Sequence, residues 1–258
     1  MSSASKCQIC ADAVVERTTA LAARLGEQGL PPARLLFQIC GTWAGIQAVQ
    51  RLEATGLQCQ VTHVYSFAQA VAAIKAAAAV LVVNITHVNL WYDRHPGAIR
   101  DPQAPRQDAG GDSSGINVGA RAAAAMYAYA QQQGGVTKVI VAGLRKADEA
   151  IALSGVDYMI MPSDVSDKLR KQSTLQGYND GLSAASSTEG TAGVPVLSVE
   201  AVAAREFKAQ DVADVDEAHF AAELGMAGVD LLQSKLADDI AAVAKVAALM
   251  ENMAIARE

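Results

Sequence analysis

Five short apolar runs, each separated from the next by a stretch with helical periodicity, most constrain the fold of this 258-residue chain. Runs of this length bounded by turn signals are typical of buried strands. They cover residues 35–40, 60–65, 80–85, 138–143 and 158–162. Strands that alternate with helices pair in parallel, and parallel strands are continuously apolar because helices cover them. The sequence therefore predicts an α/β domain built from parallel βα units.

Helix signals occupy the intervals between these runs. Thr42 is expected to cap a helix that ends before Gly56, and Ser66 to cap the next one. Two further helices are predicted over 119–133 and 146–154. Near the carboxyl terminus, apolar residues three and four apart predict one amphipathic helix packed along the flank of the domain. They are Val229, Leu232, Leu236, Ile240, Val243, Val246 and Met250.

Two long segments, 93–118 and 171–215, have no periodicity and are predicted as loops. The first contains GGDSSG at 110–115, which shares only its glycine content with phosphate-binding loops. Because no strand closely precedes it, a plain loop is the better interpretation. No linker or repeat divides the chain, so we expect a single domain over residues 1–258.

Charge and composition narrow the classes of partner. The net charge of −6 and a pI near 5.3 leave no basic face for nucleic acid. No signal peptide or apolar run long enough for a membrane span is evident. We therefore expect a soluble protein that is not secreted, in the cytoplasm or an organelle matrix or stroma. Cys7 and Cys10 form a CxxC pair without two further ligands at suitable spacing, so no metal and no cofactor are predicted.

Several motifs resemble one known family. TWAGI at 42–46, RLEATG at 51–56 and VTHVYSFAQA at 61–70 occur in the order and spacing of transaldolases, as does AGLRKADEAIALSGVD at 142–157. The resemblance covers residues 14–255. It implies a class I aldolase-type (β/α)₈ barrel, of which the five runs match the last five strands. The predicted fold is thus a transaldolase-like TIM barrel, incomplete, with a C-terminal amphipathic helix.

The resemblance also implies that Gln38 stands where transaldolases carry a lysine. That lysine's amine attacks the ketose carbonyl and forms a Schiff base, which requires a basic primary amine. The nitrogen of Gln38 is an amide whose lone pair is delocalised into its carbonyl group. It cannot form an iminium ion, so the covalent route is closed at this position.

The other implied site residues are a mixture of matches and departures. Thr62 matches a threonine that helps to hold the catalytic water, and Arg145 matches one of two phosphate-binding arginines. Gln60 replaces an asparagine that binds substrate hydroxyls, and Val82 replaces a serine. Asn84 stands where an aromatic residue is usual, and His87 where the other phosphate-binding arginine is expected.

Strand alternation directs Gln38, Gln60, Thr62 and Asn84 toward the barrel axis. They would form either a remodelled sugar-binding cluster or a buried amide network that satisfies its own hydrogen bonds. Arg145 would grip a phosphate or form a rim salt bridge with Asp148 or Glu149.

Lys146 and His63 carry two further functional groups near the predicted site. Lys146 is a candidate for a displaced Schiff-base lysine, because it lies close to the face where barrel sites are found. His63 is predicted to point outward beneath a helix as a core histidine.

Five parallel strands fall short of the eight that close this barrel. The resemblance implies three earlier βα units, with an aspartate, a glutamate and an asparagine of the site. Without them, the runs at 35–40 and 158–162 would be open edges, and a homo-oligomer, a protein partner or the chain's own termini would have to cover them. The leading hypothesis is a pseudoenzyme that serves as a structural or interaction subunit. The alternatives are an active transaldolase-type transferase of the pentose phosphate pathway and a sugar-phosphate-binding sensor.

Overall fold

A five-stranded parallel sheet forms the centre of the protein. The structure is a computed structural model that describes residues 10–94, 118–171, 206–207 and 215–255. The strands follow chain order, β1-β2-β3-β4-β5, and all four neighbouring pairs are parallel. Their bounds are Phe37–Cys40, Cys59–Thr62, Val80–Asn84, Lys138–Ala142 and Tyr158–Met159. All five predicted strands are therefore confirmed, each somewhat shorter than its apolar run.

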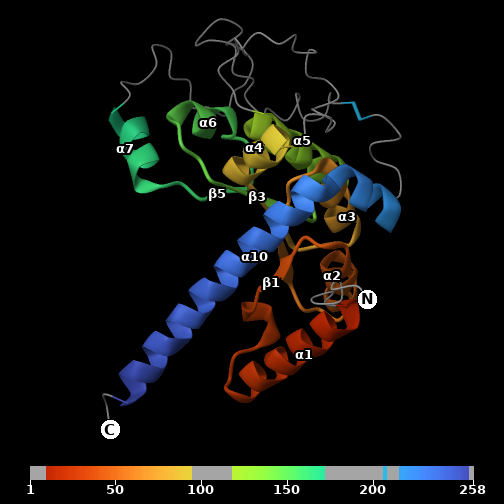
Figure 1. The fold of residues 1–258 in the computed structure, drawn as a ribbon, viewed down its shortest axis with the longest axis vertical. Helices are drawn as coiled ribbons and strands as arrows, with labels where there is room; N and C mark the ends of the chain where they lie inside the picture. The colour runs from red at the N-terminus through yellow and green to blue at the C-terminus, as the bar shows by residue number, and fades with distance from the viewer. Residues whose placement is uncertain (1–9, 95–117, 172–205, 208–214, 256–258) are drawn as a thin grey trace, which may run out of the picture.

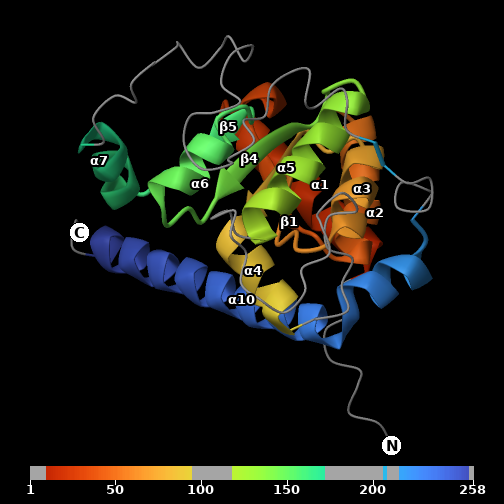
Figure 2. The ribbon, with the colours of Figure 1, turned by 90° about the horizontal axis from the view of Figure 1, so that it is seen from above.

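Helices connect the strands and cover one face of the sheet (Figure 1). Helix α2 packs on β1 and β2, α3 on β3, and α5 on β4, while α1 forms a further layer on α2. Figure 2 shows α1, α2, α3 and α5 gathered along this side. Their bounds are Ala11–Glu27 (α1), Trp43–Ala54 (α2), Phe67–Lys75 (α3), Val118–Gln132 (α5) and Ala147–Ala152 (α6), with a short 3₁₀ turn at Pro32–Arg34.

The predicted helix starts are confirmed. The hydroxyl of Thr42 accepts a hydrogen bond from the Gly45 amide at 2.9 Å, and Ser66 forms a reciprocal capping box with Gln69. Beyond Thr42, Val49 and Leu52 face the core and are almost completely buried. The caps satisfy amide groups that the first helical turn leaves without partners, which sets where each helix begins.

Two helices were missed from the sequence, α4 (Ile85–Arg94) and α7 (Ser163–Lys171). In α4, Val88 and Trp91 are buried three residues apart, but the helix follows β3 without an intervening loop, and its first residue, Ile85, also continues the mostly apolar run of the strand. The sequence pattern therefore predicts a strand that extends to residue 85. These helices also shorten the predicted loops at 93–118 and 171–215, most of whose residues, including 110–115, lie outside the described ranges.

The second face of the sheet is the more exposed one. Register aligns Gln38 with Gln60, Gln60 with Val80, and Ile140 with Tyr158, so these side chains share a face. We call this the inner face. It comprises Leu36, Gln38, Gln60, Val80, Val82, Ile140, Tyr158 and Ile160.

Burial confirms that the sheet is open rather than closed into a barrel. Residues alternate along the strands, and those on the helix-covered side are buried while inner-face residues are exposed or half-buried. Leu36 is 45% exposed, Tyr158 60% and Ile160 58%. In a closed barrel the corresponding positions would fill the interior. The outer edges of β1 and β5 pair with no other strand among the described residues.

A long C-terminal helix, α10 (Glu217–Ile255), crosses the molecule. It contains one break in helical geometry at Gly225, where φ is 63°. The helix packs on α3 and α4, and its distal part extends away from the sheet (Figure 1). Ile240 and Val243 on this part are 63% and 69% exposed. None of the helices in the described ranges is long and apolar enough to span a membrane.

Candidate functional site

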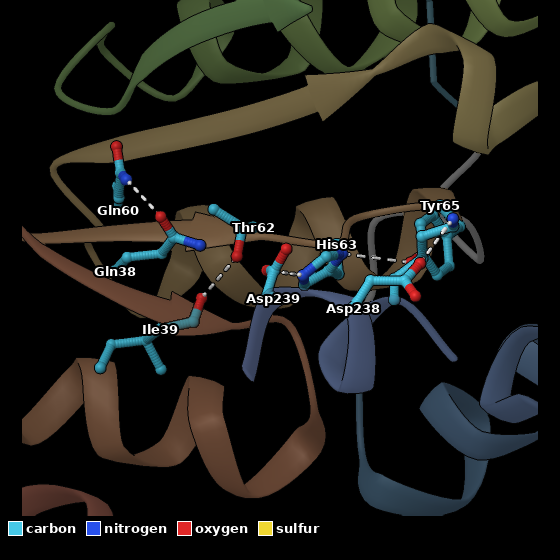
Figure 3. Close-up of polar contacts among 9 residues, drawn as sticks. Gln38, Ile39, Gln60, Thr62, His63, Tyr65, Asp238 and Asp239 are labelled. Atoms are coloured by element: carbon cyan, nitrogen blue, oxygen red, sulfur yellow. Dashed lines mark hydrogen bonds and ion pairs between the residues drawn. The ribbon is translucent and has the colours of Figure 1, made fainter. Parts of the chain in front are cut away.

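Gln38 and Gln60 form a side-chain pair on the inner face. The Gln60 amide nitrogen donates to the Gln38 oxygen at 3.2 Å, across the parallel pairing of β1 with β2 (Figure 3). The structure therefore brings together the two amides that the sequence predicted to lie side by side. The expectation of a buried network is wrong, because Gln38 is exposed and the bond is open to solvent. An open sheet leaves no interior in which to bury it.

Thr62 and Asn84 do not join this pair. Thr62 is buried, and its hydroxyl donates to the Ile39 carbonyl at 3.5 Å. The Asn84 side-chain oxygen accepts a hydrogen bond from the His87 amide at 3.2 Å, so Asn84 caps the first turn of α4. Neither side chain contacts Gln38 or Gln60 through a hydrogen bond, and the four-residue cluster expected from strand alternation is not formed.

A second polar cluster lies at the carboxyl ends of the strands, beneath α10. His63 directly follows β2, and its Nε2 is 2.9 Å from an Asp239 carboxylate oxygen of α10. The Tyr65 hydroxyl is 3.3 Å from His63 Nδ1. The ring of His87 stacks on His63, with 6.5 Å between centroids and 15° between planes. Figure 3 shows α10 bringing Asp238 and Asp239 to this group.

His63 was predicted to point outward beneath a helix as a core histidine. Its side chain is only 9% exposed, but it makes a polar contact with Asp239 of α10. His87, proposed to replace a phosphate-binding arginine, instead makes ring contacts with His63 and Tyr65. Tyr65 and Asp239 were missed. Nothing local marks Asp239, because its partner lies far away in the sequence.

Burial dominates the electrostatics of this cluster. It raises the pKa of the Cys40 thiol to about 11, and the negative charge of Asp239 adds to the effect. It also raises the pKa of Tyr65, with smaller contributions from Cys40 and Asp239. The pKa of His87 is lowered, chiefly by burial and then by the charges of Lys235 and His63. These groups are held neutral at pH 7, which suits packing rather than proton transfer.

Gln69 is the buried residue that joins the strand ends. Its oxygen accepts from the amides of Tyr65 and Ser66, at 2.8 and 3.0 Å. Its nitrogen donates to the carbonyls of Gly41 and His63, at 2.7 and 3.2 Å. One side chain thus ties the turn after β1 to the turn after β2. The capping-box spacing of Ser66 and Gln69 could have revealed this residue.

Arg145 lies in the turn after β4. Its Nε donates to the Thr86 hydroxyl at 3.1 Å, and Thr86 in turn donates to the Gly143 carbonyl at 2.7 Å. Glu149 accepts from the backbone amides of Arg145 and Lys146, at 2.7 and 3.1 Å. In the described part of the chain the guanidinium forms no ion pair with Asp148 or Glu149, so the rim salt bridge expected as one alternative is absent.

A cavity of about 400 Å³ opens beside this arginine. It is lined by Arg145, Lys146, Ala147, Asp148, Lys168 and Lys171. Lys146 is thus one of three lysines in this cavity, since the unexpected helix α7 contributes Lys168 and Lys171. Gln38 is not among the lining residues.

Within the described ranges, no group of three or more His, Cys, Asp or Glu side chains is arranged to hold a metal ion. Cys10 is exposed and unpaired, whereas Cys7 lies outside the described residues. The chain offers amides, histidines and cations at the carboxyl ends of parallel strands, the end at which barrel proteins place their sites. Fold and site together define an α/β barrel-type protein with an open sheet.

Sequence comparison identifies the family. The model described as Transaldolase/Fructose-6-phosphate aldolase matches residues 5–246, and the chain belongs to this family. The resemblance noted from the sequence motifs is thereby confirmed.

Curated relatives carry the name transaldolase. One from Chlamydia pneumoniae is 32% identical over 160 residues, which are 62% of this chain and 46% of the relative. Another from Baumannia cicadellinicola is 31% identical over 144 residues, 56% of this chain and 42% of the relative. A third, from Sodalis glossinidius, is 29% identical over 160 residues, which are 62% of this chain and 47% of the relative. The matched part of the chain spans about half the length of these relatives.

Proposed function

We propose that this chain is a transaldolase-family protein without Schiff-base catalysis that serves as a structural or interaction subunit. The observation that carries the proposal is the side chain of Gln38. It stands where the family resemblance implies a lysine, and its amide is engaged with Gln60. An amide is not a nucleophile toward a ketose carbonyl. Lys146 follows β4, which β2 and β3 separate from β1 in the sheet, and Gln38 does not line the cavity that contains Lys146.

The loss of catalysis is tested by mixing the protein with fructose 6-phosphate and erythrose 4-phosphate. We expect no transfer above background, beside a transaldolase that is active in the same assay. Borohydride reduction in the presence of fructose 6-phosphate should leave the protein mass unchanged, because only an imine is trapped. A covalent sugar adduct would refute the proposal and favour the active-transferase alternative.

The interaction role is supported by the inner face. Leu36, Tyr158 and Ile160 expose apolar surface on an open sheet. Within the described ranges, the outer edges of β1 and β5 have no neighbouring strand to pair with their backbone groups. Such edges and faces favour pairing with another polypeptide. We propose that a second copy or another protein covers them. The free thiols of Cys40, which is half-buried, and Cys59, which is buried, support a reducing compartment, the cytoplasm or an organelle matrix or stroma.

Light scattering coupled to size exclusion tests this role. We expect the purified chain to self-associate or to co-purify with a partner, and the double variant Tyr158→Ser/Ile160→Ser to weaken the association. Exchange of two exposed serines, Ser154→Ala and Ser163→Ala, provides a control. A stable monomer, unaffected by the double variant, would contradict the interaction role.

A second candidate function is the binding of a sugar phosphate without turnover. The specific observation in its favour is Arg145, whose guanidinium is oriented by Thr86 beside a cavity rich in lysine. Guanidinium groups recognise phosphate through forked hydrogen bonds. Calorimetric titration with fructose 6-phosphate should show binding to the wild-type chain and none to Arg145→Ala.

A further inference from the structure

The cavity beside Arg145 concentrates positive charge in a protein that is negative overall. Four of its six lining residues are cations, and only Asp148 is acidic. The whole chain carries a formal charge of −6, so the charge of the cavity lining is opposite in sign to the net charge of the protein. Clustered cations repel one another, and an anion that enters the cavity relieves this repulsion.

Few of the cationic side chains in the cavity form ion pairs, and the Glu149 carboxylate accepts from the backbone amides of Arg145 and Lys146 rather than from their side chains. Among the described residues, Lys146 and Lys171 form no ion pair, and the Arg145 guanidinium bonds only to the Thr86 hydroxyl. Lys168 pairs with Asp164 at 3.3 Å, but the two side chains are 58% and 65% exposed. Exposed ion pairs of this kind contribute little to stability. The Lys168 ammonium can therefore exchange Asp164 for an anionic group of a ligand.

The cations come from two separate parts of the fold. Arg145 and Lys146 belong to the turn between β4 and α6, while Lys168 and Lys171 lie on the last turn of α7. A ligand in the cavity is therefore contacted from two sides. Asp148 offers an oxygen that can accept a hydrogen bond from a ligand hydroxyl. The volume of about 400 Å³ falls within the range of small-molecule sites.

We propose that Lys168 and Lys171 make this cavity selective for a small molecule with two anionic groups, such as a sugar bisphosphate. Arg145 grips one phosphoryl group and the lysines of α7 neutralise the other. The inference rests on the second candidate function, phosphate binding by Arg145. It adds the substrate class and two specificity-determining residues, and it does not depend on whether the chain is catalytically active.

Calorimetric titrations with fructose 1,6-bisphosphate, fructose 6-phosphate and inorganic phosphate test the proposal. We expect the bisphosphate to bind roughly tenfold more tightly than the monophosphate, since each added ionic contact in a solvent-exposed site contributes modestly. The double variant Lys168→Gln/Lys171→Gln should lose about fivefold or more in bisphosphate affinity and less than twofold in monophosphate affinity. Raising the salt concentration should reduce the preference.

Lys245→Gln is the matched control, because it removes one positive charge from an exposed position on α10. Arg145→Gln should abolish binding of both sugar phosphates. Monophosphate binding without preference for the bisphosphate, or a preference that the lysine variants leave intact, would overturn the inference and leave the second candidate function standing. If neither sugar phosphate binds, both the inference and the second candidate function are refuted. The transfer assay tests the loss of catalysis separately.

Discussion

His63 and Asp239, 176 positions apart in the sequence, meet with 2.9 Å between Nε2 and a carboxylate oxygen. His63 follows the end of β2 and adopts a φ of 58°, in the left-handed region that side chains other than glycine seldom occupy. Asp239 belongs to α10, the helix that packs on α3 and α4. This contact holds the long helix against the carboxyl ends of the strands, where Thr62 and Cys40 are shielded from solvent.

A double-mutant cycle measures this contact. The variants His63→Ala, Asp239→Ala and their combination should give a coupling free energy of about 1 kcal/mol in urea unfolding at pH 7, because one partner remains half-exposed. The exposed pair Lys235 and Asp238, three residues apart on α10, should give only a few tenths of a kcal/mol. Equal coupling in both cycles would contradict a specific role for His63 and Asp239.

Acid should weaken the fold through His87. Burial and the charges of Lys235 and His63 lower its pKa below the ordinary 6.5, against the opposing effect of Asp239 and Asp238. Below that pH the unfolded chain takes up a proton that the folded chain resists binding. The free energy of unfolding therefore falls as the pH drops from 7.5 to 5. Above this window the contribution of neutral His87 to stability is fully present. Urea midpoints across the range should show a smaller fall in His87→Gln than in the wild-type chain.

Replacing Gln69 with leucine should destabilise the protein by about 3 kcal/mol. The substitution keeps the volume nearly constant but leaves backbone amides and carbonyls in two turns without partners, and unsatisfied buried groups are costly. Gln50→Leu on the exposed side of α2 is the matched control and should change stability by less than about 0.5 kcal/mol. Chemical unfolding of both variants provides the comparison, and similar losses would argue against the role of Gln69.

Gly143→Ala should be more harmful than Gly56→Ala. Both glycines have positive φ, 75° and 83°, so both variants carry the same kind of backbone strain. A Cβ atom at Gly143 would meet the Asn84 side-chain oxygen and disturb the cap of α4, whereas at Gly56 it would meet no atom within 4 Å. We expect an extra loss of about 1–3 kcal/mol for Gly143→Ala. Thermal unfolding of the two variants isolates the clash from the strain, and equal losses would exclude it.

The strands and most of the helix starts were predictable because their signals are local. The apolar run before Gly41 and the hydroxyl of Thr42 act within a few residues of one another. Helix α4 was missed for a related reason. It follows β3 without an intervening loop, and Ile85 at its start reads as the end of the strand's apolar run, which is compatible with either structure. Helix α7 is mostly polar; it buries Val165 and packs the partly buried Leu169 against the core.

The candidate site was predictable only in part. Gln38 and Gln60 were expected to be neighbours, and they are, because consecutive βα units place β1 beside β2 and strand alternation directs both side chains to the same face. Asn84 was expected beside them, but a nearby backbone amide at His87 offered its side chain a closer partner.

The amino-acid sequence alone determined the βα order, the helix caps, the family motifs and the presence of an amide at residue 38. Local periodicity and residue chemistry suffice for these properties. Only the tertiary structure decided that Gln38 is exposed, that α10 delivers Asp239 to His63, and that α7 places two lysines beside Arg145. Such relationships depend on how distant segments pack and on whether the sheet closes, and neither is encoded in the spacing of neighbouring residues.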